Sequence, residues 1–302
     1  MKKFIFTILL SLVIIVLIDF VFGLTCSYLS THAKGGDTYS INYIANEAYE
    51  DIIILGSSRA SHHYIPSIFT DSLNMATYNA GKDGNGIIAM YGRLIMLTSR
   101  YKPKVIIYEV TAGFDIEKND NHKYLDVLKR HYDKNGIDEI FASVDEREGI
   151  KMNSNLYRYN TSFIQLISDN IRPTQVIIDG GYKPMFDKLT YEPKKNERNK
   201  DAEVIWDPVK KMYFRKLVEL CKEKDIKLIF AISPFYAASN AKSFIPVIKF
   251  CNENNITLLN HYCDSSFINN KDFFADPSHL NHDGANCYSK IIAGEMKLLL
   301  KD

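Results

Sequence analysis

Two kinds of hydrophobic pattern alternate along the chain after residue 50. Short, continuous apolar runs lie at residues 51–56, 104–110, 226–232 and 256–259. Runs of this length are typical of strands that are buried on both faces of a parallel sheet. Apolar residues at helical spacing lie at residues 87–101, 204–224, 241–254 and 283–300. Strands that alternate with helices in this way predict an α/β fold, built as a three-layer, doubly wound parallel sheet.

Two segments depart from this alternation. Residues 114–203 are rich in Asp, Asn, Tyr and Lys, and they predict a partly helical insertion packed over one edge of the sheet, near the site. Within the insertion, the charged run at residues 194–201 predicts a solvated loop. Residues 26–50 are polar and predict a stalk or a loose lead-in. We therefore expect one domain at residues 51–302, interrupted by the insertion.

The start of the chain has a different character. Residues 4–24 are almost entirely apolar, and Lys2 and Lys3 stand directly before them. A helix of about 20 residues spans about 30 Å, the thickness of a hydrocarbon core. The charges predict an N-terminus inside the cytoplasm and the remaining chain outside it. The length of the run and the lack of an A-x-A site favour an uncleaved anchor at residues 1–25 over a cleaved signal peptide.

Asp19 is the one charged residue inside this apolar run. A carboxylate is costly in the middle of a bilayer. Either Asp19 lies near the outer interface or is protonated, or it contacts a polar partner within the membrane. We favour the first arrangement.

Composition narrows the function classes. The 302 residues are 46% hydrophobic and carry a formal net charge of +1, so neither a disordered chain nor a nucleic-acid partner is expected. The five cysteines form no C-x-x-C pair, and the histidines outside the motifs are scattered without ligand spacing. We therefore expect neither a metal site nor a cofactor.

Three short motifs carry candidate chemistry. The first apolar run ends in Gly-Ser-Ser-Arg, which puts Ser58 at the carboxyl end of a parallel strand, where open α/β sheets hold their sites. A glycine-rich loop at residues 78–86 lets the backbone approach a ligand closely. Asp276 stands three residues before His279, ahead of the last helix. This carboxylate can hold the imidazole by its Nδ1–H, so that Nε2 is free to take a serine proton.

In this order the three motifs resemble the blocks of the SGNH (GDSL-like) hydrolase superfamily. The resemblance covers two stretches of the chain, residues 51–113 and 226–302. It implies a flavodoxin-like sheet in which Ser58 is the nucleophile, His279 the general base and then acid, and Asp276 the residue that orients it. It also implies that the backbone N–H groups of Ser58 and Gly84 bind the oxyanion.

One block departs from the family pattern. After its second sheet strand the family has Gly-x-Asn-Asp, whose Asn side chain completes the oxyanion hole, and here Gly113 occupies the Asn position. The loss of one such donor typically costs about 10²–10³ in rate. The side chains that are candidates to replace it are Asn85, Thr111 and Arg59.

Other polar residues in the motifs are candidates for binding substrate, namely Arg59, Asn79 and Asn281. Arg59 has an alternative role, a salt bridge to Asp115 or Glu109. For His62 and His63 we expect a surface or capping role rather than catalysis.

The exported topology and the motifs imply, by this resemblance, a serine esterase or O-acyltransferase that acts on acyl esters, acetyl above all, of cell-surface glycans. It would be a single-pass bacterial membrane protein, anchored through residues 4–24, with its catalytic domain in the periplasm or at the surface. Water or a sugar hydroxyl resolves such an acyl-enzyme, so the motifs do not separate hydrolase from transferase. Two alternatives stay open: a non-catalytic glycan-binding or assembly component of a polysaccharide export system, and a lipid-directed esterase. The sequence names no protein partner.

Overall fold

A five-stranded parallel sheet forms the centre of the computed structural model, which describes residues 1–172, 179–192 and 204–301. Its strands are β1 (Ile52–Gly56), β2 (Thr77–Asn79), β3 (Val105–Glu109), β4 (Lys227–Ile232) and β5 (Thr257–Asn260). Their order is β2-β1-β3-β4-β5, and all neighbours are parallel. This order reverses the direction of winding between β1 and β3, which is the usual place for a site in a doubly wound sheet. The predicted fold class is confirmed.

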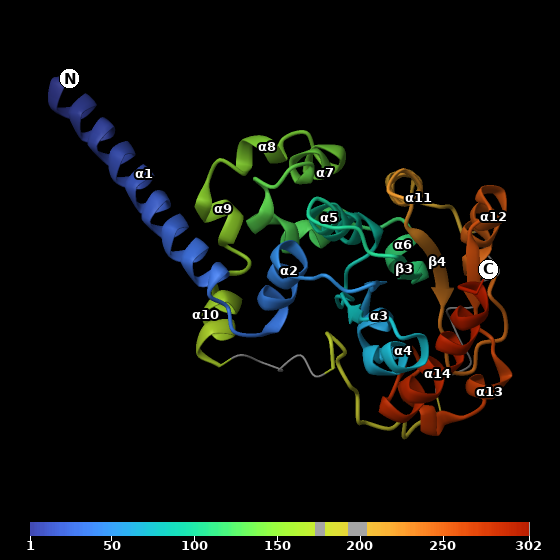
Figure 1. The fold of residues 1–302 in the computed structure, drawn as a ribbon. Helices are drawn as coiled ribbons and strands as arrows, with labels where there is room; N and C mark the ends of the chain where they lie inside the picture. Colours follow the sequence, from blue (N-terminus) through green and yellow to red (C-terminus); the bar gives the residue numbers. More distant parts are fainter. Residues whose placement is uncertain (173–178, 193–203, 302) are drawn as a thin grey trace.

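Helices cover both faces of the sheet (Figure 1). Along β1, Ile53 and Leu55 point into one core, and Ile52 and Ile54 point into the other, as the alternation of a strand requires. The first core is covered by α2 (Gly36–Asn46), α5 (Ile87–Thr98), α11 (Pro208–Glu223) and α12 (Ile245–Asn254). The second core is covered by α3 (Ser58–His63), α4 (Pro66–Leu73) and α14 (His282–Leu299).

The strand predictions agree with the structure except at β2. The four apolar runs form β1, β3, β4 and β5. Strand β2 holds only three residues, and both Thr77 and Asn79 are polar, so it forms no apolar run. The second half of the chain also contains the short elements η2 (Lys242–Phe244), α13 (Ser265–Ile268), η3 (Lys271–Phe273), β6 (Phe274–Asp276) and β7 (His279–Leu280).

The predicted loose lead-in at residues 26–50 is wrong. Helix α2 lies within it, and Ile41 and Ile44 on this helix are buried in the core beneath α5. Arg100 donates hydrogen bonds to the Ala45 carbonyl at 3.0 Å and to the Ala48 carbonyl at 3.1 Å, which satisfies backbone groups at the end of α2. The segment is therefore an integral part of the domain.

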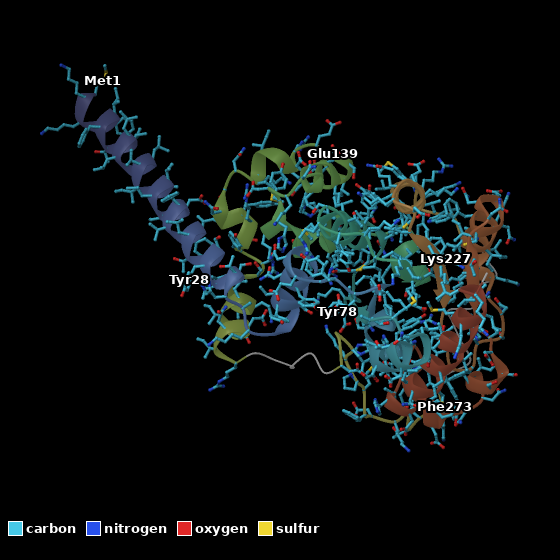
Figure 2. All side chains as sticks on the ribbon, viewed as in Figure 1. Met1, Tyr28, Tyr78, Glu139, Lys227 and Phe273 are labelled. Carbon is cyan, nitrogen blue, oxygen red and sulfur yellow. The ribbon has the colours of Figure 1, made fainter. Side chains whose placement is uncertain are left out.

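The N-terminal apolar run forms most of helix α1 (Lys2–Thr31). Figure 2 shows its first turns, near Met1, projecting away from the domain, and the side chains of residues 1–18 are exposed. The helix is long and apolar enough to cross a membrane, and a signal sequence passes the same test.

The insertion is largely helical in the part that the structure describes. Helix α6 (Ala112–Asp115) leads into it, and it contains η1 (His122–His131), α7 (Ile137–Val144), α8 (Glu148–Lys151), α9 (Asn155–Tyr159) and α10 (Phe163–Ile171). Residues 179–192 run past α3, where the Lys183 N–H donates to the Ser61 carbonyl at 3.0 Å. The charged run at residues 194–201 lies outside the described residues.

Candidate active site

The two halves of the site come from opposite ends of the domain sequence. Ser58 is the first residue of α3, directly after β1, and Ser57 is the N-cap of that helix. Strands β6 and β7 form a tight antiparallel hairpin in which Asp276 pairs with His279. The hairpin places the carboxylate and the imidazole side by side and turns both toward the carboxyl end of β1.

Ser58, His279 and Asp276 form one continuous hydrogen-bonded chain. The Ser58 Oγ lies 2.7 Å from His279 Nε2, and His279 Nδ1 lies 2.7 Å from Asp276 Oδ2. The other carboxylate oxygen accepts from the backbone N–H groups of Ser278 at 2.7 Å and His279 at 3.0 Å. Burial alone raises the pKa of Asp276, but the hydrogen bond and charge of His279 outweigh it and lower this pKa to about 2. An ionised Asp276 favours the proton on Nδ1, which leaves Nε2 as an acceptor for the serine proton.

His63 supports the hairpin from behind. Its Nε2 accepts from the Leu280 N–H at 2.9 Å, and its Nδ1 lies 2.7 Å from Ser233 Oγ. Because Nε2 is the acceptor, the proton is on Nδ1, which donates to the serine hydroxyl. Burial lowers the pKa of His63 well below its ordinary value, so this imidazole is neutral. It therefore fixes the backbone position next to His279.

A buried polar cluster joins this histidine to the sheet. Ser233 Oγ donates to Glu109 Oε1 at 2.6 Å, and Tyr64 donates to Glu109 Oε2 at 2.5 Å. Arg59 Nε lies 3.3 Å from Glu109 Oε1 and 3.0 Å from Ser233 Oγ. Burial raises the pKa of Glu109, and the Arg59 guanidinium opposes this rise. Arg59 thus forms a salt bridge with Glu109, one of its two predicted internal partners, and its role in binding substrate stays a prediction.

The other two residues predicted to bind substrate also have internal partners instead. Asn79 is buried and donates to the Ala60 carbonyl at 2.7 Å and to the Tyr64 carbonyl at 2.9 Å. Asn281 is buried and caps α14, where it accepts from the Gly284 N–H at 3.0 Å. Both amides hold the backbone around the triad, so neither presents free polar atoms to a ligand.

Two loops flank Ser58 at the carboxyl edge of the sheet: the first joins β2 to α5, and the second joins β3 to α6. The buried Asp115 carboxylate joins them, because it accepts from the Ile87 N–H at 2.8 Å and from the Thr111 N–H at 2.7 Å. Gly84 lies in the first loop with φ +72°, and a Cβ there would meet no atom within 4 Å. Its N–H has no hydrogen-bond partner in the described part of the chain. This left-handed conformation favours glycine, which has no Cβ to strain it.

Two buried oxygens in these loops lack partners. Neither Asn85 Oδ1 nor Thr111 Oγ1 has a hydrogen bond to any residue that the structure describes. Unpaired buried polar atoms are uncommon and call for a functional explanation. By contrast, the Ser58 N–H is not free, because it donates to Ser57 Oγ at 2.6 Å.

A charged cluster lies beside α3. His62 Nδ1 donates to the Lys183 carbonyl at 2.7 Å, and His62 Nε2 lies 3.5 Å from Asp83. His62 therefore joins α3 to the insertion.

The same cluster contains two ion pairs of Asp37, with Lys82 at 2.5 Å and with Lys183 at 3.0 Å. Burial raises the pKa of Asp37, but the two lysines outweigh it and lower this pKa to about 2.

Three buried side chains behind the triad were missed as site residues from the sequence. These are His63, Glu109 and Ser233: His63 was expected at the surface or in a cap, and Glu109 was considered only as a partner of Arg59. A signal existed, because Glu109 ends β3 and Ser233 directly follows β4. Polar residues at the carboxyl ends of adjacent parallel strands meet at one edge of the sheet.

Comparison with known proteins gives no family assignment. No family model matches the chain, and no curated protein matches it. Among solved structures, it is similar to one from Desulfitobacterium hafniense named as a lipolytic protein of the G-D-S-L family, with 10% identity, 81% of this chain and 98% of that chain covered, and a TM-score of 0.41. A second, named as an acylhydrolase from Bacteroides fragilis, has 12% identity, coverages of 85% and 95%, and a TM-score of 0.40. A third, named as a GDSL-like lipase from Bacteroides thetaiotaomicron, has 10% identity, coverages of 82% and 88%, and a TM-score of 0.37. At this level of similarity, the residues of this chain themselves must carry any functional assignment.

Proposed function

We propose that this protein hydrolyses acyl esters or transfers their acyl groups through Ser58. His279 is the general base, and the Asp276 carboxylate orients it. The observation that carries the proposal is the hydrogen-bonded chain from Ser58 Oγ to His279 Nε2 and from His279 Nδ1 to Asp276, with 2.7 Å at both steps. A serine hydroxyl is a weak nucleophile until a base takes its proton. The arrangement supplies that base in the required tautomer.

In the first step, Ser58 Oγ attacks the ester carbonyl and its proton passes to His279 Nε2. The resulting imidazolium is stabilised by the Asp276 carboxylate, and it returns the proton to the leaving alcohol. In the second step, His279 Nε2 takes a proton from water or from a sugar hydroxyl as that oxygen attacks the acyl-enzyme carbonyl. The bond from the carbonyl to Ser58 Oγ then breaks, the acyl group leaves on the new acceptor, and His279 returns the proton to Ser58 Oγ. The first acceptor makes the protein an esterase and the second an O-acyltransferase.

The negative oxygen of the intermediate needs preorganised donors. Gly84 is our first candidate, because its N–H has no partner among the described residues. The Ser58 N–H becomes a second donor once Ser57 Oγ rotates away from it.

Thr111 is our candidate for the side-chain donor that Gly113 lacks. In the register of β1 and β3, Gly56 pairs with Glu109, and Ser58 and Thr111 each stand two residues further along. The Thr111 hydroxyl is buried and is unpaired within the described residues, so it is available to donate. Asn85 remains the alternative donor.

We propose acyl esters of cell-surface glycans, acetyl esters above all, as the substrates. The motifs of the chain resemble the SGNH superfamily, and an N-terminal apolar helix is consistent with an extracytoplasmic domain held at the membrane. Solved structures with a similar fold are named as lipolytic, acylhydrolase or lipase-like proteins, which makes lipid esters the competing substrate class.

The test is a substrate panel applied to the full chain in detergent, with Ser58→Ala beside it. Release of acetate from O-acetylated oligosaccharides, lost in Ser58→Ala, is the expected result. Release of fatty acid from lipid esters alone would replace the glycan by a lipid. Saccharide binding that survives Ser58→Ala, with no ester turnover by either protein, would favour the non-catalytic component.

A further inference from the structure

The last third of α1 packs against the domain along one stripe. Asp19, Phe22, Gly23, Cys26 and Ser30 recur at helical spacing and are buried or partly buried, whereas the side chains of residues 4–18 are exposed. The packing partners are α9 and α10 of the insertion, which lie beside this end of α1 (Figure 1). The apolar helix is thus one continuous rod with a free half and a docked end.

Asp19 makes the most specific contact of this interface. Its carboxylate accepts from Ser154 Oγ at 2.8 Å, from the Asn155 N–H at 2.9 Å and from the Leu156 N–H at 2.8 Å. These N–H groups open α9, where helices leave donors unsatisfied. Next to Asp19, Gly23 allows the close approach, because a Cβ there would lie 2.3 Å from Asn155 Cγ. The charged residue in the apolar run is therefore explained by a polar partner within the same chain.

The position of this contact along α1 sets its depth. At 1.5 Å per residue, residues 4–18 span only about 22 Å, less than the roughly 30 Å of a hydrocarbon core. A full crossing extends to about residue 24, so Asp19 and the start of α9 lie about 7 Å inside the outer boundary. In a bilayer placed this way, the start of α9 meets lipid, and α10, which contacts α1 between Phe22 and Leu29, lies at and just beyond the hydrocarbon boundary.

Three exposed apolar side chains occur on α9 and α10 at this place. They are Leu156, Ile164 and Ile171. Leu156 itself contacts α1, because its N–H donates to Asp19. Ile164 and Ile171 each follow directly after a residue that contacts α1, Phe163 and Asn170 respectively. The Phe163 ring lies 5.1 Å from the Phe22 ring, and the Asn170 side chain donates to the Leu29 carbonyl at 2.8 Å. Ile164 is 81% exposed and Ile171 is 72% exposed. We call Leu156, Ile164 and Ile171 the collar.

Charged residues follow the collar in the direction of the domain. Lys34 and Arg172 are both exposed just beyond the end of α1 and of α10. Basic residues next to an apolar surface favour the level of the lipid phosphates. The order along α1 is therefore an apolar span, an apolar collar and then cations, as a bilayer interface requires.

We infer that α1 is a retained anchor and that the collar is seated in the outer headgroup region of a phospholipid bilayer. The occupant of this apolar surface is lipid, because the surface is continuous with the flank of the helix that crosses the membrane. Asp37 lies six residues beyond Thr31 and forms ion pairs with Lys82 and Lys183 beside α3. Placing the collar in the headgroup region therefore also fixes the position of the site relative to the membrane. This inference does not depend on Ser58 chemistry.

The test uses depth-dependent fluorescence quenching of the full chain in phosphatidylcholine vesicles that contain brominated acyl chains. The chain has one tryptophan, so Trp206→Phe provides a silent background into which single tryptophans are placed. Leu10→Trp reports the span, Ile164→Trp and Ile171→Trp report the collar, and Ile245→Trp is the matched control. Ile245 is an exposed isoleucine on α12, at the opposite end of the molecule from α1 (Figure 1).

The expected order of quenching is Leu10→Trp, then Ile164→Trp, then Ile171→Trp, then Ile245→Trp. Ile164→Trp should be quenched at least ~2-fold more than Ile245→Trp, because interfacial side chains reach about 5–10 Å into the boundary. Equal quenching of Ile164→Trp and Ile245→Trp, with Leu10→Trp strongly quenched, would show that α1 is an anchor but that the collar does not contact the bilayer. No quenching of Leu10→Trp would overturn the anchor as well. If Trp206→Phe loses its fold, the Trp206 emission of the parent is subtracted instead.

Discussion

Changing Asp276 to Asn tests the tautomer of His279 without altering the shape of the hairpin. The remaining side-chain oxygen of Asp276→Asn still accepts from the Ser278 and His279 N–H groups, as Oδ1 does now at 2.7 and 3.0 Å. The new NH₂ group then faces His279 Nδ1, where Oδ2 lies at 2.7 Å. Because two donors cannot bond each other, the imidazole moves its proton to Nε2. Nε2 can then no longer accept the proton of Ser58.

The size of the effect follows from the exposure of the pair. In a Ser-His-Asp triad this change lowers kcat by about 10⁴, or about 5.5 kcal/mol. Here the Asp276 side chain is 39% exposed and that of His279 is 21% exposed. Water can therefore offer Nδ1 another acceptor and restore part of the correct tautomer. We expect a loss of about 10³, or about 4 kcal/mol.

The assay is kcat/KM with 4-nitrophenyl acetate, with thermal unfolding of each variant measured beside it. Asp264→Asn is the matched control, because His261 Nδ1 lies 2.9 Å from Asp264 Oδ2 in a similar pair three residues apart. The control should keep its rate. Both variants should stay folded, and Asp276→Asn should lose less than about 2 kcal/mol of unfolding free energy, because solvent screens its partly exposed pair with His279. Equal rates for the two variants would refute the role of Asp276.

Three further predictions concern the hole, the scaffold and the pH dependence. Thr111→Val should lower kcat by about 10²-fold without loss of stability, because the hydroxyl gives up no hydrogen bond within the described residues; an unchanged kcat would remove it from the hole. Asn79→Ala should cost about 3 kcal/mol of unfolding free energy, because it loses three buried hydrogen bonds, and should leave KM unchanged; a raised KM with normal stability would restore its substrate role. The pKa of Asp37 is lowered from 3.8 to about 2, so its stabilisation is complete above pH 3.8 and is lost as the pH falls toward 2. Asp37→Asn should therefore cost about 2 kcal/mol of unfolding free energy at neutral pH, and its melting temperature should fall less than that of the parent protein as the pH drops below 4. An equal fall of the melting temperature in the parent and in Asp37→Asn would contradict this.

The fold was largely predictable because buried parallel strands need apolar residues on both faces. The runs at β1, β3, β4 and β5 each satisfy this requirement, and their spacing leaves room for the covering helices. Helix α2 was missed because only a few of its residues reach the core, and Ile41 and Ile44 stand among polar neighbours. Its position is fixed by tertiary contacts, including the Arg100 guanidinium, which no local pattern reveals.

The site was predictable only where its geometry is local. Asp276 and His279 meet because a two-residue turn joins their strands, and Ser58 stands at the end of a recognisable apolar run. The roles of Arg59, Asn79 and Asn281 depend on which backbone groups lie opposite them in three dimensions. The sequence marks them as polar residues near the motifs, but burial decides that they bond the protein itself.

The most direct measurement of the central claim is covalent labelling of the full chain by a fluorophosphonate probe, followed by peptide mass analysis. The probe reports an activated serine regardless of the natural acyl group. Ser61→Ala, which alters another serine of α3, is the control. The account predicts one modified residue, Ser58, labelled equally in the parent and in Ser61→Ala and not in Ser58→Ala. Absence of label from Ser58 in a folded parent protein, or equal labelling of Ser58→Ala, would contradict it.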